Sequence, residues 1–266
     1  MEKLLAINEM NWNAIMLAGD RGSNDPVNVS ANVSGKAAAK LRGRMLIEHV
    51  SSALYESNVV KQIYAVGPDE YCLNQHGEIN AILERFKITH IPPEAGPSSS
   101  ALKGVFTANA YPILVVTCDL PLLTSTMVDE FCRSMENVQA DFVVGAISYD
   151  EIKSKLPTLL KTKYKFAGHS VCFANMFAVL NESGLRAIEY WQDLESDRKK
   201  PLKLIRKIDW RGVIKYKLGK LSLDQAADGL SQKVNAKIVI KNLSIPELAV
   251  DVDSAHDYQV LNQYMQ

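Results

Sequence analysis

Short apolar runs alternate with amphipathic stretches through the first half of this 266-residue sequence, and no other feature constrains the fold as strongly. Apolar runs too short for helices predict strands at Asn13–Leu17, Gln62–Val66, Ile88–Ile91, Ile113–Thr117 and Phe142–Ile147. Apolar residues that recur every three or four positions predict helices at Arg44–Glu56, Ile79–Phe86, Ser99–Ala108 and Ser125–Met135. Near-continuous apolar strands separated by helices are typical of a parallel sheet covered on both faces. The predicted fold is therefore α/β, with a predominantly parallel sheet.

The rhythm changes after Asp150, where a lysine-rich stretch, Lys153–Lys165, precedes a mixed apolar run, Ser170–Leu180. Later patterns predict helices at Leu185–Leu194, Leu202–Trp210, Leu223–Val234 and Ala255–Tyr264, and short strands at Lys237–Ile240 and Leu248–Val250. We expect a single domain over residues 1–266 with one main core, in which the second half completes a cleft.

Charge and composition exclude several functional classes. Thirty Lys and Arg residues balance thirty Asp and Glu residues, so no global field attracts nucleic acid or an anionic membrane. No apolar run approaches the roughly 18 to 20 residues that span a bilayer. The four cysteines, Cys72, Cys118, Cys132 and Cys172, are widely separated and form no Cys-x-x-Cys pair. We therefore expect reduced, buried thiols in a cytoplasmic protein.

The first predicted strand leads directly into a loop that contains Gly19 and Gly22, within the long irregular segment 18–35. Backbone N–H groups that no strand partner uses can cradle phosphate. We expect the amides of Gly19 to Gly22 to face a polyphosphate, with Arg21 or Lys36 neutralising its charge. A surface turn with solvated basic residues is the alternative. The loop matches neither the Walker pattern nor the Gly-x-Gly-x-x-Gly dinucleotide pattern.

A later apolar strand delivers Asp119 to its carboxyl end, where Pro121 prevents the ladder from continuing. A carboxylate in this position can bind a hard cation such as Mg²⁺, which favours one or two carboxylates together with substrate phosphates and water. The alternatives are an Asx-type turn at Asp119, or capping of the next helix by Asp119 and Thr124. We favour the metal site.

A second acidic motif precedes the last predicted helix. Ser254 is expected to cap that helix, with Asp257 at its third position as an acidic variant of the capping box. Capping leaves Asp251 and Asp253 unexplained, and the mutual repulsion of two such carboxylates favours a nearby cation. In an extended strand their side chains would point to opposite faces, so only one would enter the cleft. Asp253 is our predicted second metal ligand, with Asp251 as the alternative.

Two further segments could contact ligands. Ser99 and Ser100 stand at a helix start, where serines satisfy free N–H groups and could also hydrogen-bond a base or ribose. Plain capping is the alternative. The basic run Asp197–Lys203 could seat an acceptor phosphate if it lies beside the cleft, although such a run is usually a solvated helix face.

Four segments together resemble the MobA-like nucleotidyltransferases, the molybdenum cofactor guanylyltransferase-like family. They are A-I-M-L-A-G-D at 14–20, K-A-A-A-K-L-R-G-R-M-L at 36–46, T-C-D-L-P-L-L-T at 117–124 and D-V-D-S-A-H-D-Y at 251–258. The resemblance runs from residue 13 to about residue 262 and implies a three-layer, Rossmann-like sheet of the GT-A type. It also implies transfer of a nucleoside monophosphate from an NTP to a phosphorylated small-molecule acceptor, with release of pyrophosphate and with Mg²⁺ as cofactor.

The resemblance, together with the residue patterns described above, predicts roles for individual residues. The residues expected at the nucleotide are Leu17, Ala18, Gly19, Asp20, Gly22, Ser99 and Ser100. Lys36, Arg21 and Asp119 would be catalytic, and Asp119 would bind the metal with Asp253 or Asp251. Residues 13–150 would form the nucleotide-binding half, and residues 151–266 the acceptor-side half with a closing helix.

In the implied reaction, an acceptor phosphate or hydroxyl oxygen attacks the α-phosphorus in line, while Mg²⁺ and basic side chains stabilise the developing charge. A phosphate acceptor is already ionised near neutral pH, so no histidine base is required.

One alternative function is that of a nucleotide-sugar-dependent glycosyltransferase. Such enzymes normally have an Asp-x-Asp motif at this position, where Asp119 is here followed by Leu120 and Pro121. Another is a non-catalytic nucleotide-binding module, because Asp20 replaces the second glycine of the family's usual pair. A homo-oligomer is compatible with the sequence.

Overall fold

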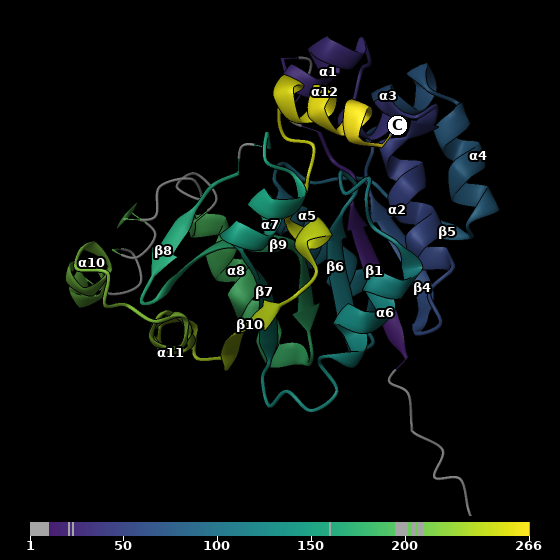
Figure 1. The fold of residues 1–266 in the computed structure, drawn as a ribbon. Helices are drawn as coiled ribbons and strands as arrows, with labels where there is room; N and C mark the ends of the chain where they lie inside the picture. The colour runs from purple at the N-terminus through teal and green to yellow at the C-terminus, as the bar shows by residue number, and fades with distance from the viewer. Residues whose placement is uncertain are drawn as a thin grey trace, which may run out of the picture.

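The structure, a computed structural model, describes residues 11–20, 22, 24–159, 161–194, 202–203, 206 and 210–265. Within these residues an eight-stranded sheet lies between helices on both of its faces (Figure 1). The chain therefore has the predicted three-layer α/β architecture.

Seven strands follow the order β10-β7-β9-β6-β1-β4-β5 across the sheet, and β8 pairs with β9. Their bounds are β1 Trp12–Leu17, β4 Val60–Val66, β5 Ile88–Ile91, β6 Ile113–Thr117, β7 Phe142–Ser148, β8 Tyr164–Phe166, β9 His169–Val179 and β10 Ile238–Leu243. The pairs β1–β4, β1–β6, β4–β5 and β7–β10 are parallel, whereas β9 is antiparallel to both β6 and β7. The chain leaves β1 for β4 on one side and returns to β6 on the other, so the strand order reverses at β1.

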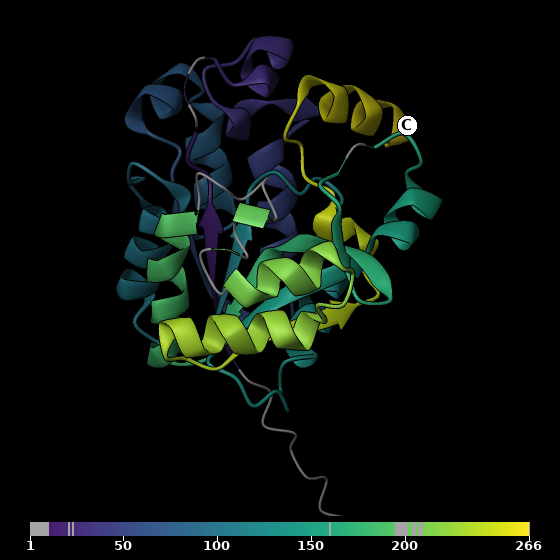
Figure 2. The ribbon, with the colours of Figure 1, turned by 90° about the vertical axis from the view of Figure 1, so that its left-hand side faces the viewer.

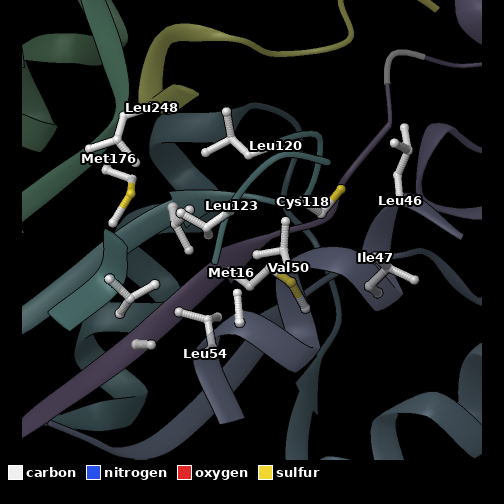
Figure 3. Packing of buried hydrophobic residues seen from close by; sticks show 14 of the residues in the cluster. Met16, Leu46, Ile47, Val50, Leu54, Cys118, Leu120, Leu123, Met176 and Leu248 are labelled. Atoms are coloured by element: carbon white, nitrogen blue, oxygen red, sulfur yellow. The ribbon is translucent and has the colours of Figure 1, made fainter. Parts of the chain in front are cut away.

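One face of the sheet packs against helices that follow the strands of the first half. They are α2 Leu46–Tyr55, α4 Glu78–Arg85, α6 Ser125–Arg133 and α7 Tyr149–Lys155. Their apolar side chains share a core with Ala14 and Met16 of β1. Figure 3 shows part of this core, where Met16 lies beside Val50 and Leu54 of α2.

The opposite face packs against α5, α8 and α11. Their bounds are Pro97–Ala108, Leu185–Leu194 and Leu223–Val234. This core contains Ile15 and Leu17 of β1, because successive residues of a strand point to opposite faces. Beyond it, α10 (Trp210–Lys217) lies beside α11 in front of the sheet (Figure 2). Tyr216 of α10 packs edge-on against Phe166 of β8, with ring centroids 5.9 Å apart.

The remaining elements are short or lie at the carboxyl ends of the strands. They are α1 Pro26–Ala31, η1 Lys36–Ala38, β2 Lys40–Leu41, β3 Arg44–Met45, α3 Glu70–Gln75, η2 Glu182–Gly184, η4 Pro246–Ala249 and α12 Ala255–Tyr264. α1 and α12 lie side by side at one end of the molecule although they come from opposite ends of the chain (Figures 1 and 2).

Most predicted elements are confirmed within a residue or two, and β5, β6, α8, α11 and α12 have the predicted bounds. The segment 18–35, expected to be irregular, contains the helix α1. Asp25 caps α1 by accepting a hydrogen bond from the amide of Val27 at 2.9 Å, and Pro26 occupies the first helical turn. An Asp-Pro pair is a helix-start signal, and it is present in the sequence.

One predicted strand is wrong, and one predicted helix begins two residues later than expected. The apolar run Leu248–Val250 is not a strand, because Pro246 starts the 3₁₀ helix η4 and the run is buried by packing. The helix predicted from Arg44 begins at Leu46, because Arg44 and Met45 pair with β2 in a short hairpin. The predicted helix Leu202–Trp210 lies largely outside the described residues.

The four cysteines are buried free thiols, as predicted. In the described part of the chain, every helix is too short or too polar to cross a membrane.

Gly67 follows β4 with a φ of 92°, in the left-handed region that favours glycine. A Cβ atom there would lie 2.6 Å from the main-chain nitrogen of Gly19 and 2.7 Å from the carbonyl carbon of Ala18. Backbone strain and overpacking should make Gly67→Ala lower the free energy of unfolding by about 2 to 4 kcal/mol, measured by urea denaturation. Gly77→Ala is the control, because a Cβ at Gly77 meets no described atom within 4 Å. Equal losses in the two variants would contradict the argument.

Candidate active site

The carboxyl ends of β1 and β6 lie side by side where the strand order reverses. The amide of Cys118 donates to the carbonyl of Leu17 at 2.9 Å, which joins the segments that leave these two strands. The amide of Val252 donates to the carbonyl of Asp119 at 3.0 Å, so the C-terminal motif lies against the end of β6. Open α/β sheets bind ligands in this position. Motifs from distant parts of the sequence therefore meet at one edge of the sheet.

Lys36 begins η1, and its side chain is almost fully buried at this edge. Its ammonium donates to Asp119 Oδ2 at 2.5 Å and to the carbonyl of Val252 at 3.1 Å, and it lies 3.4 Å from Asp253 Oδ1. Burial lowers the pKa of the Lys36 ammonium, but the carboxylates of Asp119 and Asp253 outweigh that effect and raise the pKa above its ordinary value. Lys36 therefore stays positively charged across the physiological pH range.

Asp119, Asp251 and Asp253 form an acidic cluster, in which one carboxylate oxygen of each residue lies within 4.8 Å of the others. Residues 251–253 pair with no strand, and the side chains of Asp251 and Asp253 do not point to opposite sides, because an oxygen of each lies within 4.8 Å of the other and of Asp119. The expectation that only one of the two enters the cleft is therefore wrong. Both carboxylates approach Asp119.

The acidic cluster has the properties of a cation site. Asp119 Oδ1 is buried and has no hydrogen-bond partner among the described residues. Burial raises the pKa of Asp251, Lys161 opposes that shift, and Asp119 and Asp253 add to it. Carboxylate oxygens are the ligands that Mg²⁺ prefers in proteins. The residues present therefore fit a hard divalent cation.

Lys161 belongs to the site, although the sequence patterns did not single it out. Its ammonium donates to the main-chain carbonyl of Asp251 at 2.6 Å and to Asp251 Oδ1 at 2.5 Å. Burial lowers the pKa of Lys161, but Asp251 outweighs this effect and raises it. Only the fold separates Lys161 from exposed lysines of the same stretch, such as Lys163 and Lys165.

The segment before Lys161 is fixed by contacts of its own. The ammonium of Lys153 donates to the carbonyls of Pro157 and Leu159, at 2.8 and 2.7 Å. His256 Nε2 lies 3.0 Å from the carbonyl of Thr158, which ties the segment to α12. These contacts hold the backbone from which Lys161 reaches the acidic cluster.

The two lysines do not fully neutralise the acidic cluster. The ammonium groups of Lys36 and Lys161 face the carboxylates of Asp119, Asp251 and Asp253, which leaves one negative charge when all five groups are ionised. A divalent cation would reverse the sign of the net charge at this edge. The same edge would then attract an anionic ligand such as a polyphosphate.

Asp20 lies in the first loop and uses its charge within that loop. Its carboxylate accepts hydrogen bonds from the amides of Gly22 at 2.9 Å and Lys36 at 2.5 Å, and from the side-chain amide of Asn28 at 3.0 Å. Each hydrogen bond to a charged group contributes about 1.5 to 3 kcal/mol, so displacing the carboxylate would cost on the order of 5 kcal/mol. The Gly22 amide, expected to face a polyphosphate, is directed at Asp20 instead.

The other residues expected at the nucleotide take different positions. Ala18 donates its amide to the carbonyl of Val66 at 2.9 Å, and Leu17 is buried at the end of β1. Gly19 follows them into the loop, where a Cβ would lie 3.6 Å from Pro93. Arg21 lies outside the described residues.

Ser99 and Ser100, at the start of α5, make local hydrogen bonds. Ser100 Oγ accepts from the amide of Glu94 at 3.0 Å, and Ser99 Oγ accepts from the side chain of Gln192 at 3.1 Å. These bonds fix the loop before α5 and join α5 to α8. The basic run Asp197–Lys203 lies outside the described residues, apart from its last two positions.

Comparison with known proteins identifies a family. Residues 14–197 match the sequence profile described as "MobA-like NTP transferase domain". This match covers well over half of the chain and includes Lys36, Asp119 and Lys161. Among curated proteins, no sequence matches significantly.

Solved structures with the same fold include a hypothetical transferase and two synthases, one of them complexed with CTP. A hypothetical transferase from Thermus thermophilus is 23% identical with a TM-score of 0.73, over 94% of this chain and 100% of that chain. CMP:2-keto-3-deoxy-manno-octonic acid synthetase complexed with CTP is 8% identical with a TM-score of 0.58, over 97% and 98%. The 4-diphosphocytidyl-2C-methyl-D-erythritol synthase of Anaerococcus prevotii is 12% identical with a TM-score of 0.58, over 98% of both chains. At these identities, the likeness establishes the fold.

Lys161→Met should destabilise the protein, because it leaves the largely buried carboxylate of Asp251, whose side chain is 17% exposed, without its cation. Removing one partner of a buried ion pair costs about 3 to 5 kcal/mol, and we expect a loss near the lower value in urea denaturation at pH 7. The double variant Lys161→Met/Asp251→Asn should recover about half of that loss. Lys165→Met, at an exposed position on β8, is the control. An undiminished loss in the double variant would show that Lys161 acts through its aliphatic chain rather than through Asp251.

Proposed function

Because the chain belongs to the MobA-like NTP transferase family, we propose that it transfers the nucleoside monophosphate of an NTP to a phosphorylated small-molecule acceptor and releases pyrophosphate. The observation that carries this proposal is the buried ammonium of Lys36, held against Asp119 and Asp253 at the carboxyl ends of β1 and β6. A similar structure is complexed with CTP, which supports an NTP as the donor.

The acidic cluster would hold Mg²⁺ through the carboxylates of Asp119, Asp251 and Asp253. The buried, unpartnered Oδ1 of Asp119 supports this assignment. A bound divalent cation supplies charge neutralisation for the phosphate oxygens of the donor and for the leaving pyrophosphate. Lys161 favours the ionised form of Asp251 and orients its side chain, because its ammonium binds both the carboxylate and the main-chain carbonyl of that residue.

Lys36 stabilises the negative charge that develops on the transferred phosphoryl group. Its three N–H groups face Asp119, Asp253 and the carbonyl of Val252, so the ammonium would act through its fixed positive charge rather than through a free hydrogen-bond donor. Phosphoryl-group transfer depends mainly on positioning and on charge stabilisation, which is what a fixed ammonium supplies. Arg21 is proposed to assist from the first loop, as the sequence suggested.

A phosphorylated acceptor fits a site without a general base. The phosphate oxygen that attacks the α-phosphorus is ionised near neutral pH and needs no proton removed. His49, His90 and His256 each lie within hydrogen-bond distance of a main-chain carbonyl, which is a structural use of their rings. We therefore assign the acceleration to positioning and electrostatics.

We propose that the chain works as one nucleotidyltransferase domain. Residues 13–150 would bind the nucleotide at the first loop and at the start of α5, where Ser99 and Ser100 would lie near the base or ribose. Residues 151–266 would provide the acceptor side. The antiparallel strand β9 supports a single domain, because it inserts the second half of the chain between β6 and β7 of the first.

The proposal is tested first by measuring the binding of NTPs and then by measuring the release of pyrophosphate. A thermal-shift panel of the four NTPs with magnesium should identify the base by the largest rise in Tm. Pyrophosphate release is then measured with that NTP and a set of phosphorylated sugars, polyols and cofactor precursors. Tight NTP binding without pyrophosphate release from any acceptor would favour a nucleotide-binding module instead.

Asp119→Asn should lower pyrophosphate release by about 100-fold or more, because the amide keeps the local shape but removes charge that holds the cation and Lys36. Because the change also leaves the buried ammonium of Lys36 without its nearest carboxylate, the Tm should fall, so turnover is compared at a temperature at which both proteins are folded. Asp224→Asn, at an exposed position on α11, is the charge-matched control and should retain full activity. Near-normal turnover of Asp119→Asn at limiting magnesium would refute the metal assignment.

Lys36→Met should weaken binding of the NTP about tenfold or more while leaving the nucleoside affinity nearly unchanged, because its proposed partner is phosphate. Isothermal titration calorimetry with the NTP and with the matching nucleoside measures the two affinities. Lys40→Met removes a nearby exposed ammonium and serves as the control. Equal weakening of both ligands in Lys36→Met would point to a base contact or to misfolding.

A further inference from the structure

The charge of Asp20 stands close to the proposed phosphate site, and simple electrostatics would make it an obstacle to an anionic ligand. The geometry indicates a different use. Both carboxylate oxygens accept hydrogen bonds, one from the amide of Gly22, the other from the amide of Lys36, and both from the side chain of Asn28. The carboxylate of Asp20 is therefore bound by three residues that follow it in the chain, Gly22, Asn28 and Lys36.

The surroundings of Asp20 are shaped for its carboxylate. Asn28 is almost fully buried on α1, and its side-chain amide also donates to the carbonyl of Gly22 at 3.2 Å. Gly35 leaves room for the carboxylate, because a Cβ there would lie 3.2 Å from Asp20 Oδ2 and 2.6 Å from Cys72 Sγ. The helix α1 is itself anchored by the cap at Asp25. The loop thus closes around a fixed anion.

Lys36 is held by hydrogen bonds at both ends, at its main-chain amide and at its side-chain ammonium. Its main-chain amide donates to Asp20 at 2.5 Å, and its ammonium donates to Asp119 at 2.5 Å. A long, flexible side chain reaches a defined point only if the backbone that carries it is fixed. Asp20 fixes that backbone at the first residue of η1.

We infer that Asp20 is a positioning residue, whose carboxylate organises the first loop and fixes the backbone from which the Lys36 side chain extends. It acts through Lys36 and binds neither the nucleotide nor the metal; within the described residues, the metal-type acidic cluster is formed by Asp119, Asp251 and Asp253 without it. The inference deepens the proposed function and rests on it. Simple electrostatics predicts that neutralising Asp20 strengthens binding of an anion. The inference predicts the opposite, that neutralising Asp20 weakens it.

The test uses the full chain and inorganic tripolyphosphate with magnesium, a probe that has no base or ribose. Asp20→Asn should weaken tripolyphosphate binding about tenfold in isothermal titration calorimetry, because Lys36 is no longer fixed. Asp25→Asn is the matched control, since it removes one carboxylate from the same loop, keeps a residue suited to capping α1, and touches neither Lys36 nor Gly22 by its side chain. Tighter binding by Asp20→Asn would overturn the inference and show that the carboxylate competes with the anion.

A double-mutant cycle separates positioning from general stability. If Asp20 acts through Lys36, then Asp20→Asn in a Lys36→Met background should change tripolyphosphate affinity by less than about threefold. Full additivity of the two losses would overturn the inference. Should Asp20→Asn fail to fold, Asp20→Glu replaces it: the charge stays but the carboxylate moves by one methylene, and binding should weaken in the same way. If Asp20→Glu binds tripolyphosphate as tightly as the unmodified protein does, the charge of residue 20 matters and the position of its carboxylate does not, which would overturn the inference.

Hydrogen exchange tests Asp20 without any ligand. In Asp20→Asn, the amide of Lys36 should exchange about tenfold faster or more, while Asp25→Asn leaves it unchanged. Unchanged protection in Asp20→Asn would refute the positioning role even if the protein transfers nucleotides. Failure of the unmodified protein to bind tripolyphosphate would instead count against the proposed function, and the exchange result would still decide the role of Asp20.

Discussion

The buried ion pair between Lys36 and Asp119 is the contact on which the arrangement of this site depends. An ammonium so deeply buried is tolerated only if its charge is matched and its hydrogen bonds are satisfied. Asp119 at the end of β6 and Asp253 in the C-terminal segment provide that match, together with the carbonyl of Val252. The first loop, the end of β6 and the segment before α12 must therefore be placed together. Each of these three segments depends on the other two for the charges and hydrogen bonds that fix its position.

Much of this arrangement could be predicted from local sequence patterns. The apolar run that ends at Thr117, with Pro121 shortly after it, places Asp119 at the end of a strand. Ser254 accepts from the amide of Asp257 at 3.1 Å, as the capping pattern before α12 indicated. These features depend on residues only a few positions apart. Strand ends in parallel sheets share an edge, so the meeting of the motifs also follows from the topology.

The rest depends on contacts that no local pattern encodes. Lys161 is one of several lysines in its stretch, and its role appears only when Asp251, 90 residues away, is brought beside it. Asp20 was expected at the nucleotide, whereas its hydrogen bonds to Gly22, Asn28 and Lys36 give it a structural role. The run Leu248–Val250 looked like a strand because burial, rather than strand pairing, selects apolar residues there.

The charged groups of the site come from residues 36, 119, 161, 251 and 253, so their contacts close loops of up to 217 residues. During synthesis, a nascent chain that ends before residue 251 lacks the carboxylates of Asp251 and Asp253, so Lys161 is without its ion-pair partner and Lys36 can pair only with Asp119. Long-range contacts of this kind form late, because the entropy of loop closure must be overcome first. The site would thus be among the last parts of the molecule to assemble. An incomplete chain would contain most of the sheet but lack an organised centre of charge.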